Sequence, residues 1–120
     1  MKKLFLATLL ASAFSIGASA QTKALQVAKI STPTIQCDMC KTKIEEYLKR
    51  VDGVTFVKVA VKKKEVTVKY LSDRTNIEMI KASIANVGYD AGEIAANPES
   101  YKMLPKCCKK PEDGGGMPKH

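Results

Sequence analysis

Three stretches of the chain have the hydrophobic and polar pattern of β-strands. Residues 24–30 are mostly apolar, and residues 54–61 are rich in valine. Residues 65–71 (EVTVKYL) alternate strictly between polar and apolar side chains, which is typical of a strand with one buried face. Because the polar turn at 62–64 separates the last two stretches, they are predicted to form a hairpin.

Two further stretches have the pattern of amphipathic helices. Residues 39–51 place apolar side chains at offsets of 0, 4, 7, 8 and 11 from Cys40, which is one face of a helix. Residues 77–87 place them at offsets of 0, 3, 7 and 10. Thr75 followed by Glu78 fits a capping box, so Thr75 is predicted to be the N-cap of this second helix. A glycine soon follows each stretch and predicts its end.

The order of these elements predicts an α+β fold of the ferredoxin-like type. A weaker last strand is predicted at residues 89–95, although Gly92 interrupts it. The full order is then βαββαβ, a four-stranded antiparallel sheet with two helices on one face. A short helix at 98–104 is predicted to follow, with Asn97 as its cap and Pro98 in its first turn.

The first 20 residues have the features of an export signal. Two lysines precede a short apolar run, and Ala18-Ser19-Ala20 forms a small-x-small cleavage site. The run is too short to span a membrane permanently, although an uncleaved anchor is the alternative. The protein is therefore expected to be periplasmic or secreted, with no stable membrane insertion after cleavage. Residues 21–96 are predicted to form one domain, and residues 97–120 a flexible C-terminal extension.

The composition restricts the classes of function. The formal net charge is +8, but an exported protein meets little nucleic acid. The same element order also builds RNA-recognition motifs, whose sheets carry stacking aromatic side chains that residues 65–71 do not supply. His120 is the sole histidine, and no carboxylate pair has a catalytic spacing. We therefore expect neither a nucleic-acid partner nor an enzyme.

The chemistry of the chain is concentrated in its four cysteines. Cys37 falls in the loop after the first predicted strand, and Cys40 falls in the first turn of the first helix. The positive end of a helix dipole favours thiolates. Thiolates prefer soft ions, and a pair of them suits a low-coordinate ion such as Cu(I) or Hg(II), with Zn(II) or Cd(II) also possible.

With this cysteine pair in this element order, residues 24–95 resemble the heavy-metal-associated domain family. Cys37, Cys40, the Gly53-Val54 turn and Val87-Gly88-Tyr89 carry the resemblance. It implies an apo monomer that binds a soft metal ion and sequesters it, or passes it by thiolate exchange to a metal transporter or another metal-binding protein. It also implies that Tyr89 shields the metal. Thr34-Ile35-Gln36 replaces the family's usual Gly-Met-Thr, so the resemblance does not define the ion.

Cys107 and Cys108 are not required by that family. Adjacent cysteines can bind soft metal, form a strained disulfide or remain free, and Met117 and His120 in the same tail are further possible ligands. The predicted last strand runs away from the cysteine loop. An extended tail could still return to Cys37, but a helix at 98–104 would shorten its reach. Cys107 and Cys108 are therefore interpreted as an auxiliary thiol site.

A thiol–disulfide oxidoreductase is the alternative function. An exported C-x-x-C pair at the start of a helix is also the arrangement of thioredoxins. The chain has no tryptophan beside the pair, and no proline stands just before a late strand to face it. The hairpin in the middle of the chain also fits the metal-binding fold better. We therefore rank metal binding above disulfide chemistry.

Overall fold

A computed structural model describes residues 25–115 of the chain. The predicted export signal at residues 1–20 lies outside the described residues, as do Met117 and His120. Among the described residues, no helix has both the length and the apolar character needed to cross a membrane.

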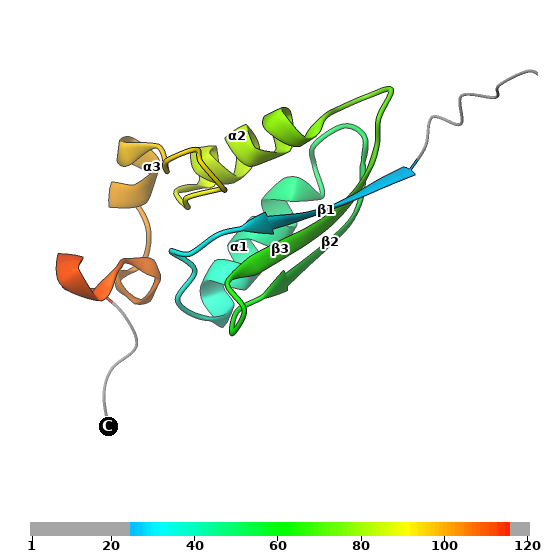
Figure 1. Cartoon of the computed structure of the whole chain (residues 1–120). Helices are drawn as coiled ribbons and strands as arrows, with labels where there is room; N and C mark the ends of the chain where they lie inside the picture. Colours follow the sequence, from blue (N-terminus) through cyan, green and yellow to red (C-terminus); the bar gives the residue numbers. More distant parts are fainter. Residues whose placement is uncertain (1–24, 116–120) are drawn as a thin grey trace, which may run out of the picture.

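The described part contains one antiparallel sheet of three strands, β1 (Leu25–Ser31), β2 (Val54–Ala60) and β3 (Glu65–Leu71). β3 lies in the middle, between β1 and β2 (Figure 1). Two rows of side chains cross the sheet in register and are buried on one face: Ala28, Val68 and Val57, then Ile30, Val66 and Val59. The three predicted strands and the hairpin are therefore confirmed, with one buried face.

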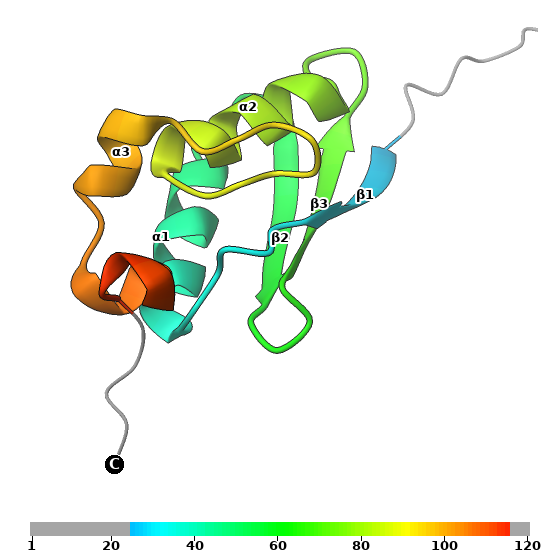
Figure 2. The same ribbon diagram turned by 60° about the vertical axis from the view of Figure 1, so that its left-hand side comes forward.

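Two helices, α1 (Asp38–Leu48) and α2 (Ile77–Val87), cover the buried face of the sheet (Figures 1 and 2). Ile44, Leu48, Ile80 and Ile84 from their apolar stripes are fully buried, whereas Tyr47, which was predicted on the stripe of α1, is 42% exposed. α1 ends three residues earlier than predicted. The amide of Val51 donates to the carbonyl of Leu48, an i to i−3 bond, so the chain leaves the α-helix in a tighter turn.

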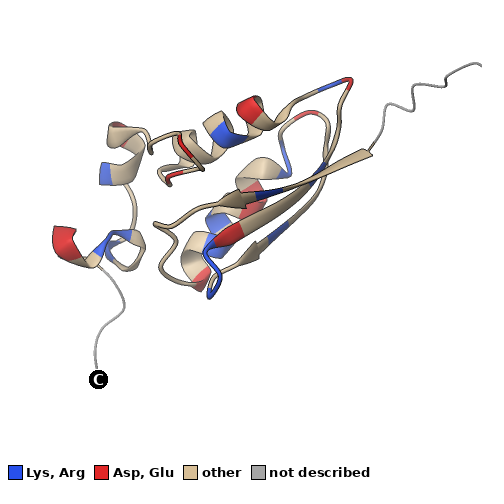
Figure 3. Cartoon of the chain, viewed as in Figure 1, with Lys and Arg blue, Asp and Glu red and all other residues tan. Residues whose placement is uncertain are grey.

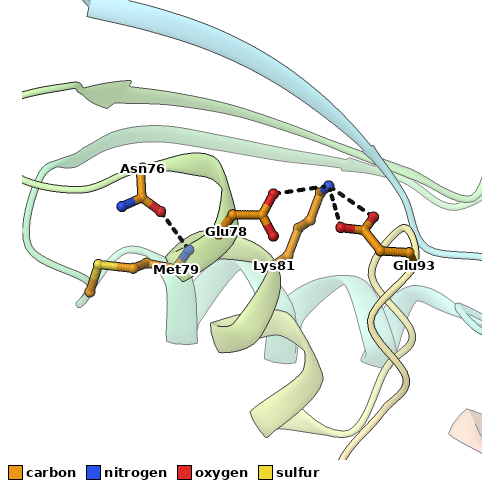
Figure 4. A network of polar contacts seen from close by, with 5 residues as sticks. All are labelled: Asn76, Glu78, Met79, Lys81 and Glu93. Carbon is orange, nitrogen blue, oxygen red and sulfur yellow. Dashed lines mark hydrogen bonds and ion pairs between the residues drawn. The ribbon is translucent and has the colours of Figure 1, made fainter.

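The start of α2 corrects the predicted cap. Asn76, and not Thr75, is the N-cap, because its side chain accepts a hydrogen bond of 2.9 Å from the amide of Met79 (Figure 4). Thr75 is buried one position earlier. On the same helix, Lys81 forms ion pairs with Glu78 and Glu93, and Glu93 lies in the loop that follows α2 (Figure 4).

The predicted fourth strand at 89–95 is wrong. Within the described residues this segment is a tight turn closed by a single bridge between Ala91 and Ile94. Gly92 has φ +57° and donates one hydrogen bond to the carbonyl of Ser31, at the end of β1. The left-handed glycine turns the chain back after this one contact, so no ladder along β1 forms.

The turn at 89–95 redirects the rest of the chain. The amide of Asn97 donates to the carbonyl of Ala85, and the predicted capped helix follows as α3 (Pro98–Lys102). Two 3₁₀ turns come next, η1 (Lys106–Cys108) and η2 (Pro111–Asp113). α3 lies beside the end of α2, and η1 lies beside α1 (Figures 1 and 2).

Candidate metal site

The two central thiols lie at the N-terminus of α1. Cys37 is the N-cap residue, with extended backbone, and its carbonyl accepts hydrogen bonds from the amides of Cys40 and Lys41. Cys40 is in the first turn and fully buried, whereas Cys37 is 7% exposed. Their Sγ atoms are 3.5 Å apart. The positions predicted for the pair, on the loop and in the first helical turn, are those of the structure.

The loop before Cys37 is held on both sides. Ile35 is completely buried, and the side-chain ammonium of Lys64 donates to its carbonyl. The hydroxyl of Thr34 accepts a hydrogen bond of 3.0 Å from the amide of Asp90, next to Tyr89. These contacts connect the cysteine loop to the β2–β3 turn and to the end of α2, so the position of Cys37 is set by the fold.

The tail thiols reach the same place. The Sγ atom of Cys37 lies 3.3 Å from that of Cys107 and 3.8 Å from that of Cys108. The sulfurs of Cys37, Cys40 and Cys108 all lie within 4.8 Å of one another, and these three residues are buried. The sequence predicts a separate auxiliary site for Cys107 and Cys108, but the structure places both thiols in one cluster with the predicted pair.

Tyr89 is also at the site. Its side chain is completely buried, and no described atom forms a hydrogen bond with its hydroxyl. Burial raises the pKa of Tyr89 far above its ordinary value, and the adjacent thiols of Cys108 and Cys40 raise it further. The hydroxyl is therefore a neutral donor that faces the sulfurs without a partner of its own.

The pKa values of three of the thiols, those of Cys37, Cys107 and Cys108, are shifted in different directions. Burial acts to raise the pKa of Cys37, but the backbone of Cys40 and the thiol of Cys107 outweigh it, so the net shift is downward. The thiol of Cys37 raises the pKa of Cys107, and burial raises that of Cys108. Cys37 is therefore the thiol that ionises most readily among the three that have a resolved shift.

The ligand atoms of this cluster restrict which metal ions it can bind. Sulfur is the dominant ligand type, the cluster is mostly buried, and the thioether of exposed Met39 lies 3.8 Å from Cys107 Sγ at its edge. Soft ions bind such a set, whereas Mg(II) and Ca(II) require oxygen ligands. A small α+β domain with a thiol pair at the start of its first helix belongs to the class of domains that can hold a soft metal ion.

The comparisons with known proteins agree with that class. The family model of the heavy-metal-associated domain matches residues 29–90. The copper chaperone CopZ of Staphylococcus haemolyticus is 34% identical over 61 residues, which cover 51% of this chain and 90% of the relative. The mercuric transport protein periplasmic component of Shigella flexneri is 31% identical over 90 residues, 74% of this chain and 93% of the relative.

Solved structures share the fold. A CopZ metallochaperone superposes with a TM-score of 0.54 and 27% identity, over 55% of this chain and 98% of its own. A copper-binding domain from a P-type ATPase superposes with a TM-score of 0.53 and 25% identity, over 54% of this chain and 88% of its own. The chain belongs to the heavy-metal-associated domain family.

The return of the tail is what the sequence interpretation missed. Leu104 is buried in the core although the surrounding tail is polar. Its side chain lies against Gly88, where an added Cβ would approach it to 3.2 Å. An isolated leucine after a capped helix was the available signal for a docked segment. Gly92 within the predicted fourth strand was the signal that this strand would not form.

Proposed function

We propose that this protein is exported and binds one soft metal ion, Cu(I) or Hg(II), between Cys37 and Cys40. The observation that carries the proposal is the convergence of these two thiols, 3.5 Å apart, at the N-terminus of α1. A helix N-terminus stabilises the thiolate form that the ion requires. The match to a mercuric transport periplasmic component supports the export that residues 1–20 predict.

The proposed role is to sequester the ion or to pass it to a partner, without catalysis of a chemical reaction. Relatives named as copper chaperone and mercuric transport protein support a carrier. A thiolate of the partner enters as an additional ligand, and a thiolate of this chain then leaves, so the ion is transferred without being free in solution. The copper-binding domain of a P-type ATPase among the similar structures supports a metal transporter as the partner.

The test is Cu(I) binding by the reduced full chain, measured anaerobically against a coloured Cu(I) chelator. Cys37→Ser and Cys40→Ser are expected to abolish tight binding while the far-ultraviolet circular dichroism stays unchanged. Cys107→Ser is the matched control, because it makes the same atom change at the half-exposed edge of the cluster, and it should retain binding. Unchanged Cu(I) affinity in both Cys37→Ser and Cys40→Ser would refute the assignment.

Cu(I) uptake and turnover of a test disulfide, both measured on the full chain, distinguish metal carriage from disulfide chemistry. A carrier takes up one Cu(I) per chain and does not turn over a test disulfide in the presence of a reductant. A chain that reduces the test disulfide catalytically, and takes up no Cu(I) or Hg(II) when reduced, would instead be an oxidoreductase.

A further inference from the structure

Cys108 lies 71 residues after Cys37 in the sequence, yet their sulfurs are 3.8 Å apart. We propose that Cys108 is a third ligand to the ion held by Cys37 and Cys40, so that the C-terminal extension completes the metal site from within the same chain. This inference rests on the proposed function, and it changes the expected coordination of the ion from two sulfurs to three.

The distances between the sulfurs favour three ligands over two. With metal–sulfur bonds of about 2.3 Å, two sulfurs on opposite sides of an ion lie about 4.6 Å apart, and three in a trigonal plane lie about 4.0 Å apart. The observed separations are 3.5 Å between Cys37 and Cys40 and 3.8 Å between Cys37 and Cys108, with all three sulfurs within 4.8 Å. Opening the first pair to a linear site requires about 1 Å of movement, whereas a trigonal site requires about half of that.

The fold holds Cys108 in place before an ion arrives. The amide of Cys108 donates to the carbonyl of Pro105 at 2.8 Å, which closes η1. On one side of η1, Leu104 is buried in the core. On the other side, the hydroxyl of Tyr101 accepts a hydrogen bond of 2.9 Å from the amide of Lys110. A ligand that is already ordered loses little entropy when it binds, which increases the affinity of the site.

The local charge suits a site with three thiolates. One Cu(I) ion with three thiolates carries two negative charges in total. Lys106, Lys109 and Lys110 flank the adjacent cysteines in the sequence, and the segment that follows α3 carries both basic and acidic residues in Figure 3. The N-terminus of α1 adds a positive dipole end at Cys37. These groups favour the anionic complex through Coulomb attraction.

Cys107 lies at the edge of the thiol cluster, whereas Cys108 lies inside it. It is half-exposed, its sulfur lies 3.3 Å from that of Cys37 and 3.8 Å from that of Met39, and it is outside the set of three mutually close buried sulfurs. Cys108 is completely buried. Two adjacent cysteines of the same chain thus provide a ligand and its matched control.

A third internal ligand also affects transfer. A partner's thiolate must displace Cys108 before it can form a three-coordinate intermediate with Cys37 and Cys40. Since a tethered ligand acts at a high effective concentration, the extension slows release of the ion to a competitor. Cys108→Ser is therefore expected to release Cu(I) to an excess of chelator about tenfold faster than the wild type, while Cys107→Ser releases it at a rate close to that of the wild type.

The deciding measurement is X-ray absorption at the copper edge of the reduced full chain loaded with one Cu(I). Three sulfur neighbours are expected for the wild type and for Cys107→Ser, and two for Cys108→Ser. Cys108→Ala is the second variant, because it keeps an apolar group in the core if serine disturbs the fold. Urea unfolding of each apo variant shows whether the fold is retained.

Two results would overturn the inference in distinguishable ways. Two sulfur neighbours in the wild type, with binding still abolished by Cys37→Ser, would remove Cys108 from the site and leave the proposed function standing. A wild-type chain that takes up no Cu(I) and no Hg(II) would refute both the role of Cys108 and the proposed function. The wild-type spectrum decides the first case even if both variants at Cys108 unfold.

Discussion

Tyr89→Phe removes one oxygen atom that is buried beside the thiol cluster. This hydroxyl has no hydrogen-bond partner among the described residues, although its side chain is completely buried. An unsatisfied buried polar group costs about 1–3 kcal/mol of stability. The variant is therefore expected to raise the free energy of unfolding of the reduced apo protein by about 1 kcal/mol, the lower end of that range.

The same change is expected to have the opposite effect on metal binding. When Cys40 and Cys108 become thiolates around an ion, the Tyr89 hydroxyl gains a charged acceptor, and such hydrogen bonds contribute about 1.5–3 kcal/mol. Its loss should weaken Cu(I) binding by about tenfold, which corresponds to about 1.4 kcal/mol. This result would also support the shielding role predicted for Tyr89.

Urea unfolding of the reduced apo protein and competition for Cu(I) measure the two effects separately. Tyr101→Phe is the matched control, because the hydroxyl of Tyr101 accepts from the amide of Lys110 and donates to the carboxylate of Asp113. That variant should destabilise the apo protein by about 1 kcal/mol. The reasoning is refuted if Tyr89→Phe lowers the free energy of unfolding as Tyr101→Phe does, or if it leaves the Cu(I) affinity unchanged.

Four further substitutions test the fold that supports the site. Gly88→Ala should lower the free energy of unfolding by about 1–2 kcal/mol and speed modification of the tail thiols by a thiol reagent, because Gly88 has φ +116° and a Cβ there would meet Leu104 at 3.2 Å. Asn76→Ala should lower the free energy of unfolding, measured with urea, by about 1 kcal/mol, because it removes the N-cap of α2. Val68→Ala should cost about 2 kcal/mol in the same assay, because this side chain is fully buried in the central strand. Glu93→Gln should reduce the loss of stability on acidification below about pH 4.5, because the backbone amide of Glu93 and its ion pair with lysine lower the pKa of this carboxyl in the folded state.

For each of these four substitutions, one result would contradict the prediction. Gly88→Ala with unchanged thiol reactivity would mean that the end of α2 does not hold the tail. If Thr75→Ala lowers the free energy of unfolding more than Asn76→Ala does, Thr75 is the N-cap, as the sequence predicts. A cost for Val68→Ala below about 0.5 kcal/mol would place that side chain outside the core. Identical pH profiles for wild type and Glu93→Gln would remove the ion pair with Lys81 from the stability of the fold.

The hydrophobic pattern predicted the first five elements because each has one face that must be buried. Val66 and Val68 alternate with polar neighbours, and Ile80 and Ile84 recur at helical spacing, so local periodicity and tertiary burial coincide. The thiol pair was also predictable, because its geometry depends on four consecutive residues at one helix start. The N-cap of α2 was missed by one position, since Thr75 and Asn76 are both good caps.

The last part of the chain could not be predicted in the same way. The segment at 89–95 is apolar enough for a strand, but the positive φ of Gly92 turns it after one hydrogen bond to β1. The location of the tail then depends on the burial of Leu104 against Gly88, a contact between segments whose local patterns do not reveal it. Cys107 and Cys108 reach Cys37 through this docking, and no spacing rule relates residues so distant in sequence.

Metal analysis of the full chain by native mass spectrometry, after anaerobic purification from the compartment in which the cell keeps it, tests the central claim most directly. The expected result is one soft metal ion per chain, with a mass that corresponds to deprotonated thiols at the cluster and a loss of the ion in Cys37→Ser. A chain that carries no metal and is two hydrogen atoms lighter than the reduced protein, as a disulfide requires, would contradict the account.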